Sequence, residues 1–347
     1  PSEAPVPTER LRQFKRLFYF NSPLGEDALL IRRLKGREAV SELFQFDLEL
    51  VSEDPFLDIN GLVGKMVTVA IRQSDEETFR YFNGYVCRAR AREPEGLLNN
   101  YDARVVPWLW FLTRTTDCYI WHEKTVQEVI EFIFAKFGFT DYRFEIRNPA
   151  LHTPWEYLTQ YRETAFAFIS RLMETEGMYY YFHQTKDKHT LVITDSKETH
   201  RECAYQSRMK LEKVSGRGYF NTEDTVRVWH YERQVRSGKY THRDFEFKTP
   251  DDHLEEEESS RAGRSLELYD YPGEYEVHPD GRAWARIRME EEEVEEEFTW
   301  GEGNSRSLMP GFKFDLYKHD RRDQNKTYLI TSVTHQGNEE NFLPEEA

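Results

Sequence analysis

The first third of the chain alternates apolar and polar residues with a period of two. Between residues 44 and 50 the even positions are Phe or Leu and the odd positions are Gln, Asp or Glu. This spacing puts four apolar side chains on one face of a strand. Five further stretches have similar character and are separated by turn residues: 17–20, 29–34, 65–71, 79–90 and 101–112. We predict six strands of a barrel or sandwich, with Pro107 at an edge position or bulge.

The period becomes helical near residue 120. Thr125 and Glu128 make a capping-box pair, an apolar stripe runs to Phe137, and Gly138 stands where a left-handed C-cap is expected. A second helix is predicted over 164–176 and is closed by Gly177. A strand-like stretch at 142–146, an aromatic stretch at 155–158 and a hairpin of 178–182 with 191–194 complete a small α+β unit.

Strand patterns return after about residue 205, at 225–235, 241–248, 312–317 and 327–334. Between them, Pro279-Asp280-Gly281 opens a predicted helix with a narrow apolar stripe of Trp284, Ile287, Val294 and Phe298. We divide the chain into an N-terminal arm (1–15), a first β domain (16–115), an α+β insertion (116–204) and a second β domain (205–347). The last domain carries an acidic loop and helix insertion at about 249–303.

Length and composition agree with several folded domains. The 347 residues exceed the roughly 100–200 that one domain usually holds. Apolar residues make up 38% and aromatic residues 15% of the chain, which excludes wholesale disorder. No apolar run is long enough to cross a membrane, and the polar, Pro-rich start does not resemble a secretory signal. We therefore expect a cytoplasmic protein.

Charge is concentrated in one segment. The formal net charge is -16, and residues 246–303 hold 20 acidic and 6 basic residues, a net charge of -14. This balance disfavours binding to a phosphate backbone. The acidic runs lack the spacing of a calcium loop, so we expect a solvated helix face or acidic loop. A role in lining a lumen or in docking stays open.

The three cysteines, Cys87, Cys118 and Cys203, show no C-x-x-C spacing. Each lies in a segment that looks structured and partly apolar. We interpret them as reduced, packed thiols, without a disulfide framework or a zinc site.

Motifs for catalysis fail on spacing. The segment 122–126 begins like H-E-x-x-H but has Val126 at the second ligand position. Segment 301–306 lacks the third glycine of a dinucleotide motif, and 61–66 does not fit a phosphate loop. Neither Ser215 nor Ser305 lies in a nucleophile elbow. We predict no catalytic, cofactor-binding or metal-binding residue and no cofactor.

Other chemistry-bearing residues fit a structural role better. His183, His189 and His335 occur in strand-like contexts. The aromatic clusters 108–111 and 178–182 are predicted to be buried in a sheet or at a subunit interface, although they could stack on sugars or bases. With 63 acidic residues, a carboxylate pair for glycoside hydrolysis stays open.

Several motifs, in order along the chain, resemble the N-terminal half of VgrG proteins, the spike proteins of the type VI secretion system. The resemblance runs from about Arg16 to Gly337 and is carried by 43–48, 155–182, 269–273, 309–314 and His335. Ala165 departs from the family, which more often has an acidic residue there; this weakens the N-terminal cap of the second predicted helix.

The resemblance implies a machine part rather than an enzyme. Its fold class is mainly β with an α+β insertion: two antiparallel β-barrel tube domains plus a small α+β domain, as in the baseplate hub of contractile phage tails. In the family, three chains make a pseudo-six-fold ring on the hexameric Hcp tube, and an oligonucleotide-binding-type domain and a needle follow. This sequence stops before both and carries no toxin domain.

The function we expect is therefore a trimeric hub that caps the Hcp tube and is exported with it to puncture target envelopes and carry effectors. Baseplate and adaptor proteins are further expected partners, nucleic acid is not, and membrane contact is expected only through the needle. Interface residues are not assignable from the sequence. The alternatives are the hub of a phage tail or related contractile device, a carbohydrate-active enzyme or sugar-binding module, and, third, a nucleic-acid-binding protein.

Overall fold

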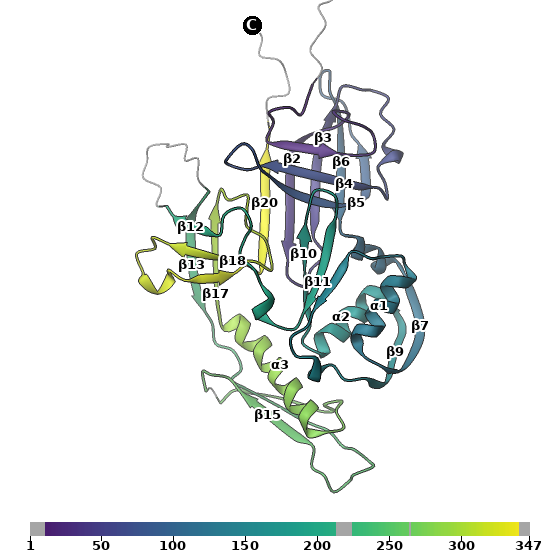
Figure 1. The fold of residues 1–347 in the computed structure, drawn as a ribbon, viewed down its shortest axis with the longest axis vertical. Helices are drawn as coiled ribbons and strands as arrows, with labels where there is room; N and C mark the ends of the chain where they lie inside the picture. Colours follow the sequence, from purple (N-terminus) through teal and green to yellow (C-terminus); the bar gives the residue numbers. More distant parts are fainter. Residues whose placement is uncertain (1–10, 213–223, 264, 340–347) are drawn as a thin grey trace, which may run out of the picture.

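The computed structural model describes residues 11–212, 224–263 and 265–339. Of the predicted N-terminal arm, only 11–15 lies in this part, and Ser215 lies outside it. The molecule is elongated (Figure 1). A β unit stands at one end, a second sheet and a helical unit lie side by side in the middle, and a helix-backed arm forms the other end.

The first sheet has seven antiparallel strands in the order β1-β4-β5-β6-β3-β2-β20. Phe46, Leu48 and Leu50 are buried on its inner face, whereas the polar residues between them are partly exposed, which confirms the predicted period of two. The strands are β1 (Phe18–Asn21), β2 (Leu30–Ala39), β3 (Gln45–Ser52), β4 (Met66–Arg72), β5 (Phe79–Ala91), β6 (Asn99–Val106) and β20 (Ser332–Asn338).

The two edges of this sheet approach each other through side chains. A Cβ atom added to Gly337 of β20 would lie 2.5 Å from the ring of Phe18 in β1. The Leu17 N–H donates to Glu339 Oε1 at 3.3 Å, just beyond these strands. The sheet is therefore curled into a barrel, and Gly337 leaves room for the ring that fills the seam.

Two sequence predictions fail in this unit. A single strand was expected at 327–334 in the second β domain, but 327–329 form a strand of the second sheet, whereas 332–338 form β20, which pairs with β2 along its whole length. Residues 107–112 were expected to continue a strand, but Pro107 is the N-cap of a 3-10 helix, η2 (Trp108–Arg114). Because Pro107 lacks an N–H to donate to a ladder, it ends β6 instead of sitting within it.

The middle unit follows the predicted order. Helix α1 (Val126–Lys136) has the Thr125–Glu128 capping box, and α2 (Ala165–Thr175) starts at the N-cap Thr164. Gly138 and Gly177 take positive φ values of 74° and 67° after the two helices, as a left-handed C-cap requires. The strands are β7 (Thr116–Lys124), β8 (Tyr142–Glu145), β9 (Trp155–Thr164), β10 (Tyr179–Gln184) and β11 (His189–Thr194).

One hydrophobic core joins the barrel to the helical unit. It runs from barrel residues such as Phe44 to Phe134 and Phe168 of the two helices. Phe44 meets Phe182 of the β10–β11 hairpin edge to face, with 5.0 Å between ring centroids. The helical unit is therefore packed against the first barrel and does not stand as a separate core.

The second sheet has the order β17-β13-β12-β18-β19. It is mixed, because β12 pairs in parallel with both β13 and β18. Its own smaller core contains Met209, Phe312 and Phe314. The strands are β12 (Arg208–Leu211), β13 (Thr225–Arg233), β17 (Glu297–Gly303), β18 (Lys313–Tyr317) and β19 (Thr327–Leu329).

The acidic segment forms the arm at the far end of the molecule (Figure 1). The arm also includes β14, which precedes this segment in the chain, and it consists of a three-stranded sheet, β15-β14-β16, backed by α3 (His278–Glu296). The strands are β14 (Lys239–Arg243), β15 (Glu255–Ser259) and β16 (Glu267–Asp270), and short 3-10 helices elsewhere are η1 (Ile59–Gly61), η3 (Pro149–Leu151), η4 (Lys197–Thr199) and η5 (Arg322–Gln324).

The apolar stripe predicted for α3 is wrong in its second half. Val294 is 66% exposed, and Phe298 belongs to β17. The residues that face the arm sheet are Ala285 and Met289, which pack with Tyr240 of β14. The buried face of α3 against this sheet thus holds one alanine and one methionine, and it lacks the wide apolar stripe of a usual surface helix.

Candidate interaction surfaces

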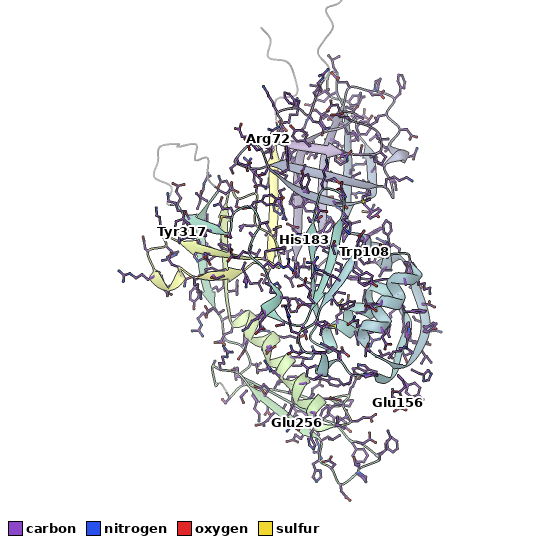
Figure 2. The ribbon with its side chains drawn as sticks, in the orientation of Figure 1. Arg72, Trp108, Glu156, His183, Glu256 and Tyr317 are labelled. Carbon is purple, nitrogen blue, oxygen red and sulfur yellow. The ribbon has the colours of Figure 1, made fainter. Side chains whose placement is uncertain are left out.

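The histidines of the strands serve packing. His189 lies between the barrel and η2: its Nε2 accepts the Trp108 backbone N–H at 2.8 Å, and its Nδ1 lies 3.0 Å from Asn83 Oδ1. Nδ1 must therefore carry the proton of a neutral ring. Burial lowers the pKa of His189 to about 3. Figure 2 shows Trp108 and His183 in the middle of the molecule, where these units meet.

A charged cluster is buried inside the first barrel. Arg80 Nη2 lies 2.7 Å from Glu38 Oε1, and His335 Nε2 lies 2.9 Å from the same oxygen. Arg80 is 1% exposed and Glu38 5%. Burial opposes ionisation of Glu38, but the charge of Arg80 and the His335 hydrogen bond hold its pKa below the usual value. The cluster joins β2, β5 and β20.

The other residues singled out by motif are dispersed. Cys203 is buried and Cys87 partly buried, but Cys118 is exposed on β7, so the prediction of three packed thiols is wrong for Cys118. His122 lies exposed on β7, against the Tyr157 ring. Among the described residues, no group of three or more His, Cys, Asp or Glu side chains could hold a metal ion. Within the same part of the chain, no helix is long and apolar enough to cross a membrane.

Most residues of the two aromatic clusters are buried, as predicted. Tyr180, Tyr181 and Phe182 are buried in β10, and Trp108 is buried against Phe134 and Phe139 of the helical unit.

An exposed apolar surface on the β7–β9 ribbon was not predicted from the sequence. On the β7–β9 ribbon, Ile120, Tyr157 and Tyr161 are more than half exposed; the alternation of β9 was the signal that could have placed both tyrosines on one face.

Helix α3 docks the arm onto the helical unit. Trp284 stacks on Trp155 of β9, with 5.3 Å between centroids and 10° between planes. Next to this pair, Ile287 covers Gly177, where an added Cβ would lie 2.9 Å from its side chain. Arg288 Nη1 reaches Glu174 of α2 at 3.3 Å. The arm is thus held at the C-terminal end of α2.

A buried His152 fixes the loop that presents Trp155. Its Nδ1 lies 2.7 Å from Glu176 Oε2 and its Nε2 lies 3.3 Å from Asp195 Oδ2. The Trp155 indole N–H donates to the other oxygen of Glu176 at 2.8 Å. Burial opposes protonation of His152, but the hydrogen bonds and charges of the two carboxylates raise its pKa above the usual value.

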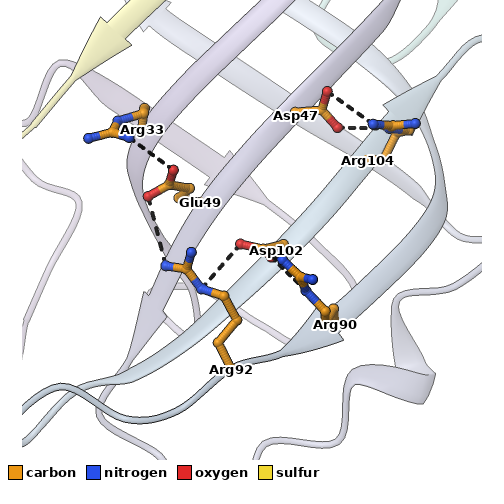
Figure 3. A network of polar contacts seen from close by, with 7 residues as sticks. All are labelled: Arg33, Asp47, Glu49, Arg90, Arg92, Asp102 and Arg104. Atoms are coloured by element: carbon orange, nitrogen blue, oxygen red, sulfur yellow. Dashed lines mark hydrogen bonds and ion pairs between the residues drawn. The ribbon is translucent and has the colours of Figure 1, made fainter.

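The outer face of the first barrel carries a ladder of charged residues (Figure 3). Asp102 pairs with Arg90 and Arg92, Glu49 with Arg33 and Arg92, and Asp47 with Arg104, the last at 2.7 Å. Lys35, Arg37 and Arg88 stand exposed on the same face. We call these residues the barrel charge ladder: Arg33, Lys35, Arg37, Asp47, Glu49, Arg88, Arg90, Arg92, Asp102 and Arg104.

The acidic segment is a solvated surface for most of its length. In β15, Glu255, Glu257 and Glu258 are exposed, and the glutamates of α3 face solvent or pair with arginines such as Arg236 and Arg288. Figure 2 marks Glu256 on this arm, far from the barrel. The run Glu255–Glu258 was expected in a loop or helix face but forms an edge strand.

The chain matches the family model of the phage tail baseplate hub (GPD) over residues 37–341. Among curated proteins, it is 37% identical over 324 residues to the type VI secretion system spike protein VgrG1c of Pseudomonas aeruginosa. It is 37% identical over 325 residues to VgrG1a of the same organism. These alignments cover 92% of this chain but only 44% and 50% of the relatives, so the chain spans about half their length.

Solved structures show the same fold. The E. coli c3393 protein, a type VI secretion component described as similar to T4 tail proteins gp27 and gp5, superposes with a TM-score of 0.69 at 18% identity. That match covers 92% of this chain and 73% of c3393. The 43 kDa tail protein of prophage MuSo2 from Shewanella oneidensis gives 0.62 at 13% identity, covering 89% and 91%.

The curled barrel, the second sheet and the helical unit that comes between them along the chain are thus the architecture of tail hubs, a family of structural proteins and not of enzymes. The mainly β fold class with an α+β insertion is confirmed, with the difference that the second sheet is mixed and not purely antiparallel. The carbohydrate-enzyme alternative has no support from these matches. The chain belongs to the phage tail baseplate hub family, within its VgrG spike group.

Proposed function

We propose that this chain is the hub half of a trimeric type VI secretion spike that caps the Hcp tube and is exported with it, carrying effectors to the target cell. The observation that carries this proposal is the 37% identity to VgrG spike proteins along 92% of the chain. The hub assembles in the cytoplasm before export. Adaptor, effector and baseplate proteins are its other partners.

Geometry supports a ring of three copies. Each chain offers two curved sheets, so three chains present six similar surfaces to a six-fold tube. Within the described part of the chain, the edge strands β1 and β20 of the first sheet are free to pair with another copy, and closing them between protomers would avoid uncontrolled edge-to-edge association. A Francisella VgrG with this fold, at 11% identity and a TM-score of 0.55, was solved in complex with PdpA, which supports protein partners for this scaffold.

Sedimentation equilibrium over a concentration series tests the ring, followed by addition of the Hcp tube protein. We expect a mass near three times 41.6 kDa and co-sedimentation with the tube. A monomer that ignores the tube, and whose fusion to a self-trimerising segment also fails to bind the tube, contradicts the proposal. That fusion separates weak association from a wrong assignment.

The hub of a phage tail or related contractile device is the second candidate. Two tail proteins favour it, one from prophage MuSo2 and one from Neisseria meningitidis MC58. The matches cover 91% and 92% of the lengths of these two proteins. Co-expression with Hcp and, separately, with a phage tail tube protein distinguishes the two. Capture of the phage tube alone would favour the second candidate.

A further inference from the structure

The barrel charge ladder has more cations than its own anions can neutralise. It holds seven arginine or lysine residues and three acidic ones, in a chain whose net charge is -16. The excess lies in one cross-strand row. There, Lys35 pairs in register with Asp47, Asp47 with Arg104, and Arg104 with Arg88. This row has three cations for one carboxylate.

The ends of that row are unneutralised. Lys35 and Arg88 are both exposed, and neither forms an ion pair with any residue in the described part of the chain. The nearest carboxylate, Asp47, is already engaged by Arg104 through two hydrogen bonds of 2.7 and 3.3 Å. The ammonium group of Lys35 and the guanidinium group of Arg88 are therefore available to an acidic surface.

The acidic arm has the complementary excess. On the edge strand β15, Glu255 and Glu258 are exposed and form no ion pair within the described ranges, whereas Glu257 binds Lys239 at 2.5 Å. A strand edge made of glutamates repels a copy of itself. This repulsion disfavours pairing of β15 with another β15, and a cationic surface is a more favourable partner.

The arm cannot reach the ladder of its own chain. In Figure 1 the strands β2, β3, β5 and β6 lie at one end of the long axis and β15 lies at the other, with the second sheet and the helical unit between. A contact between the two surfaces must therefore join different molecules. Such a head-to-tail contact closes into a ring when the rotation between copies permits it.

We propose that the acidic arm of one copy docks through its β15 edge on the barrel charge ladder of a second copy, so that Glu255 and Glu258, which flank this edge from opposite faces of the arm sheet, lie near Lys35 and Arg88. The inference rests on the proposed trimer and assigns one of its contacts. Charge complementarity of this kind fixes the register of copies and accelerates their encounter.

Four variants of the 347-residue chain test the contact by sedimentation equilibrium at low salt. The ladder variant is K35E/R88E and the arm variant E255K/E258K. The third combines all four substitutions and restores complementarity with reversed signs. The fourth, K65E, is a control that reverses an exposed charge in the same barrel outside the ladder. Near-identical far-ultraviolet spectra and melting curves establish that each variant is folded.

We expect the ladder and arm variants to need at least about tenfold higher protein concentration to assemble, and the combined variant to recover most of this loss. K65E should assemble like the parent chain, and raised salt should weaken assembly of the parent more than assembly of the ladder and arm variants.

If the parent assembles and the ladder and arm variants assemble equally well, the contact is overturned while the trimer stands. Weakening in the ladder variant alone would show a different acidic partner and would overturn the assignment to the arm. A parent chain that stays monomeric, and whose self-trimerising fusion does not bind the tube, rejects the trimer, and this contact with it.

Discussion

The indole of Trp284 lies parallel to that of Trp155, although 129 positions separate them along the chain. The pair joins the arm helix to the ribbon strand β9, and the two rings are only partly buried. Stacked aromatic pairs contribute about 0.5–1.5 kcal/mol beyond the area they bury. The position of the arm therefore depends on a few side chains and not on a large core.

We expect W155A and W284A to couple by about 1 kcal/mol in a double-mutant cycle of unfolding free energies. Each should also accelerate hydrogen exchange in α3 while exchange in β3 stays unchanged. V294A is the matched control, because Val294 is on the same helix and 66% exposed. Additive effects of the two tryptophan variants would show that the stacking carries no interaction energy.

The His152 site predicts a pH dependence of stability. Its folded-state pKa is raised above the ordinary value of 6.5, so protonation stabilises the fold fully below about pH 6.5. That contribution is lost as pH rises through the raised pKa. Urea unfolding of the parent chain and H152Q from pH 6 to 9 should show the stability difference shrinking with rising pH.

The control for this titration is H122Q. His122 is exposed on the β7–β9 ribbon and lies against the Tyr157 ring, so its replacement should leave the pH profile of the parent chain unchanged. Parallel pH profiles for H152Q and the parent chain would show that His152 does not titrate in this range.

The buried pair of Glu38 and Arg80 predicts a large cost when only one partner is removed. E38Q leaves the Arg80 guanidinium without a counter-charge in the barrel, which should cost about 3–5 kcal/mol of unfolding free energy. E42Q removes the partner of Arg37 at the surface, where both side chains are about half exposed. That variant should lose less than about 1 kcal/mol. Similar small losses for both would contradict a dry environment around Glu38.

Replacing Gly311 by alanine should lower the unfolding free energy through a steric clash as well as through backbone strain. Its φ is +79°, and an added Cβ would lie 2.3 Å from the Tyr181 ring. Gly64 has a nearly equal φ of +75° but open space around it. G64A should cost about 1–2 kcal/mol from the left-handed conformation alone, and G311A should cost clearly more. Equal losses in thermal or urea unfolding would show that Tyr181 moves aside freely.

Local patterns were enough to predict most elements. The alternation at 44–50 and the capping box at Thr125 are decided by neighbours within a few residues, and both are confirmed. The identity of the family also followed from local motifs in order. Local patterns do not specify which strand another strand will pair with. For this reason residues 332–338 were predicted to belong to the second β domain, although they pair with β2.

The missed features are those that need distant residues. Arg80 looks like an ordinary polar strand position until Glu38 and His335 are brought to it from β2 and β20. Ala285 and Met289 look too weak to define a helix face until Tyr240 supplies the missing volume. The barrel charge ladder likewise exists only after four strands are placed in register.

The pairing of β2 with β20 also determines when the barrel can be finished. Residues 332–338 leave the ribosome long after the strand at 30–39, and only then can the two strands pair. Until then, the growing polypeptide exposes the hydrogen-bonding edge of β2 and an open end of the first core. We therefore expect this stage of synthesis to be the one at which chaperones bind, and at which truncated products aggregate.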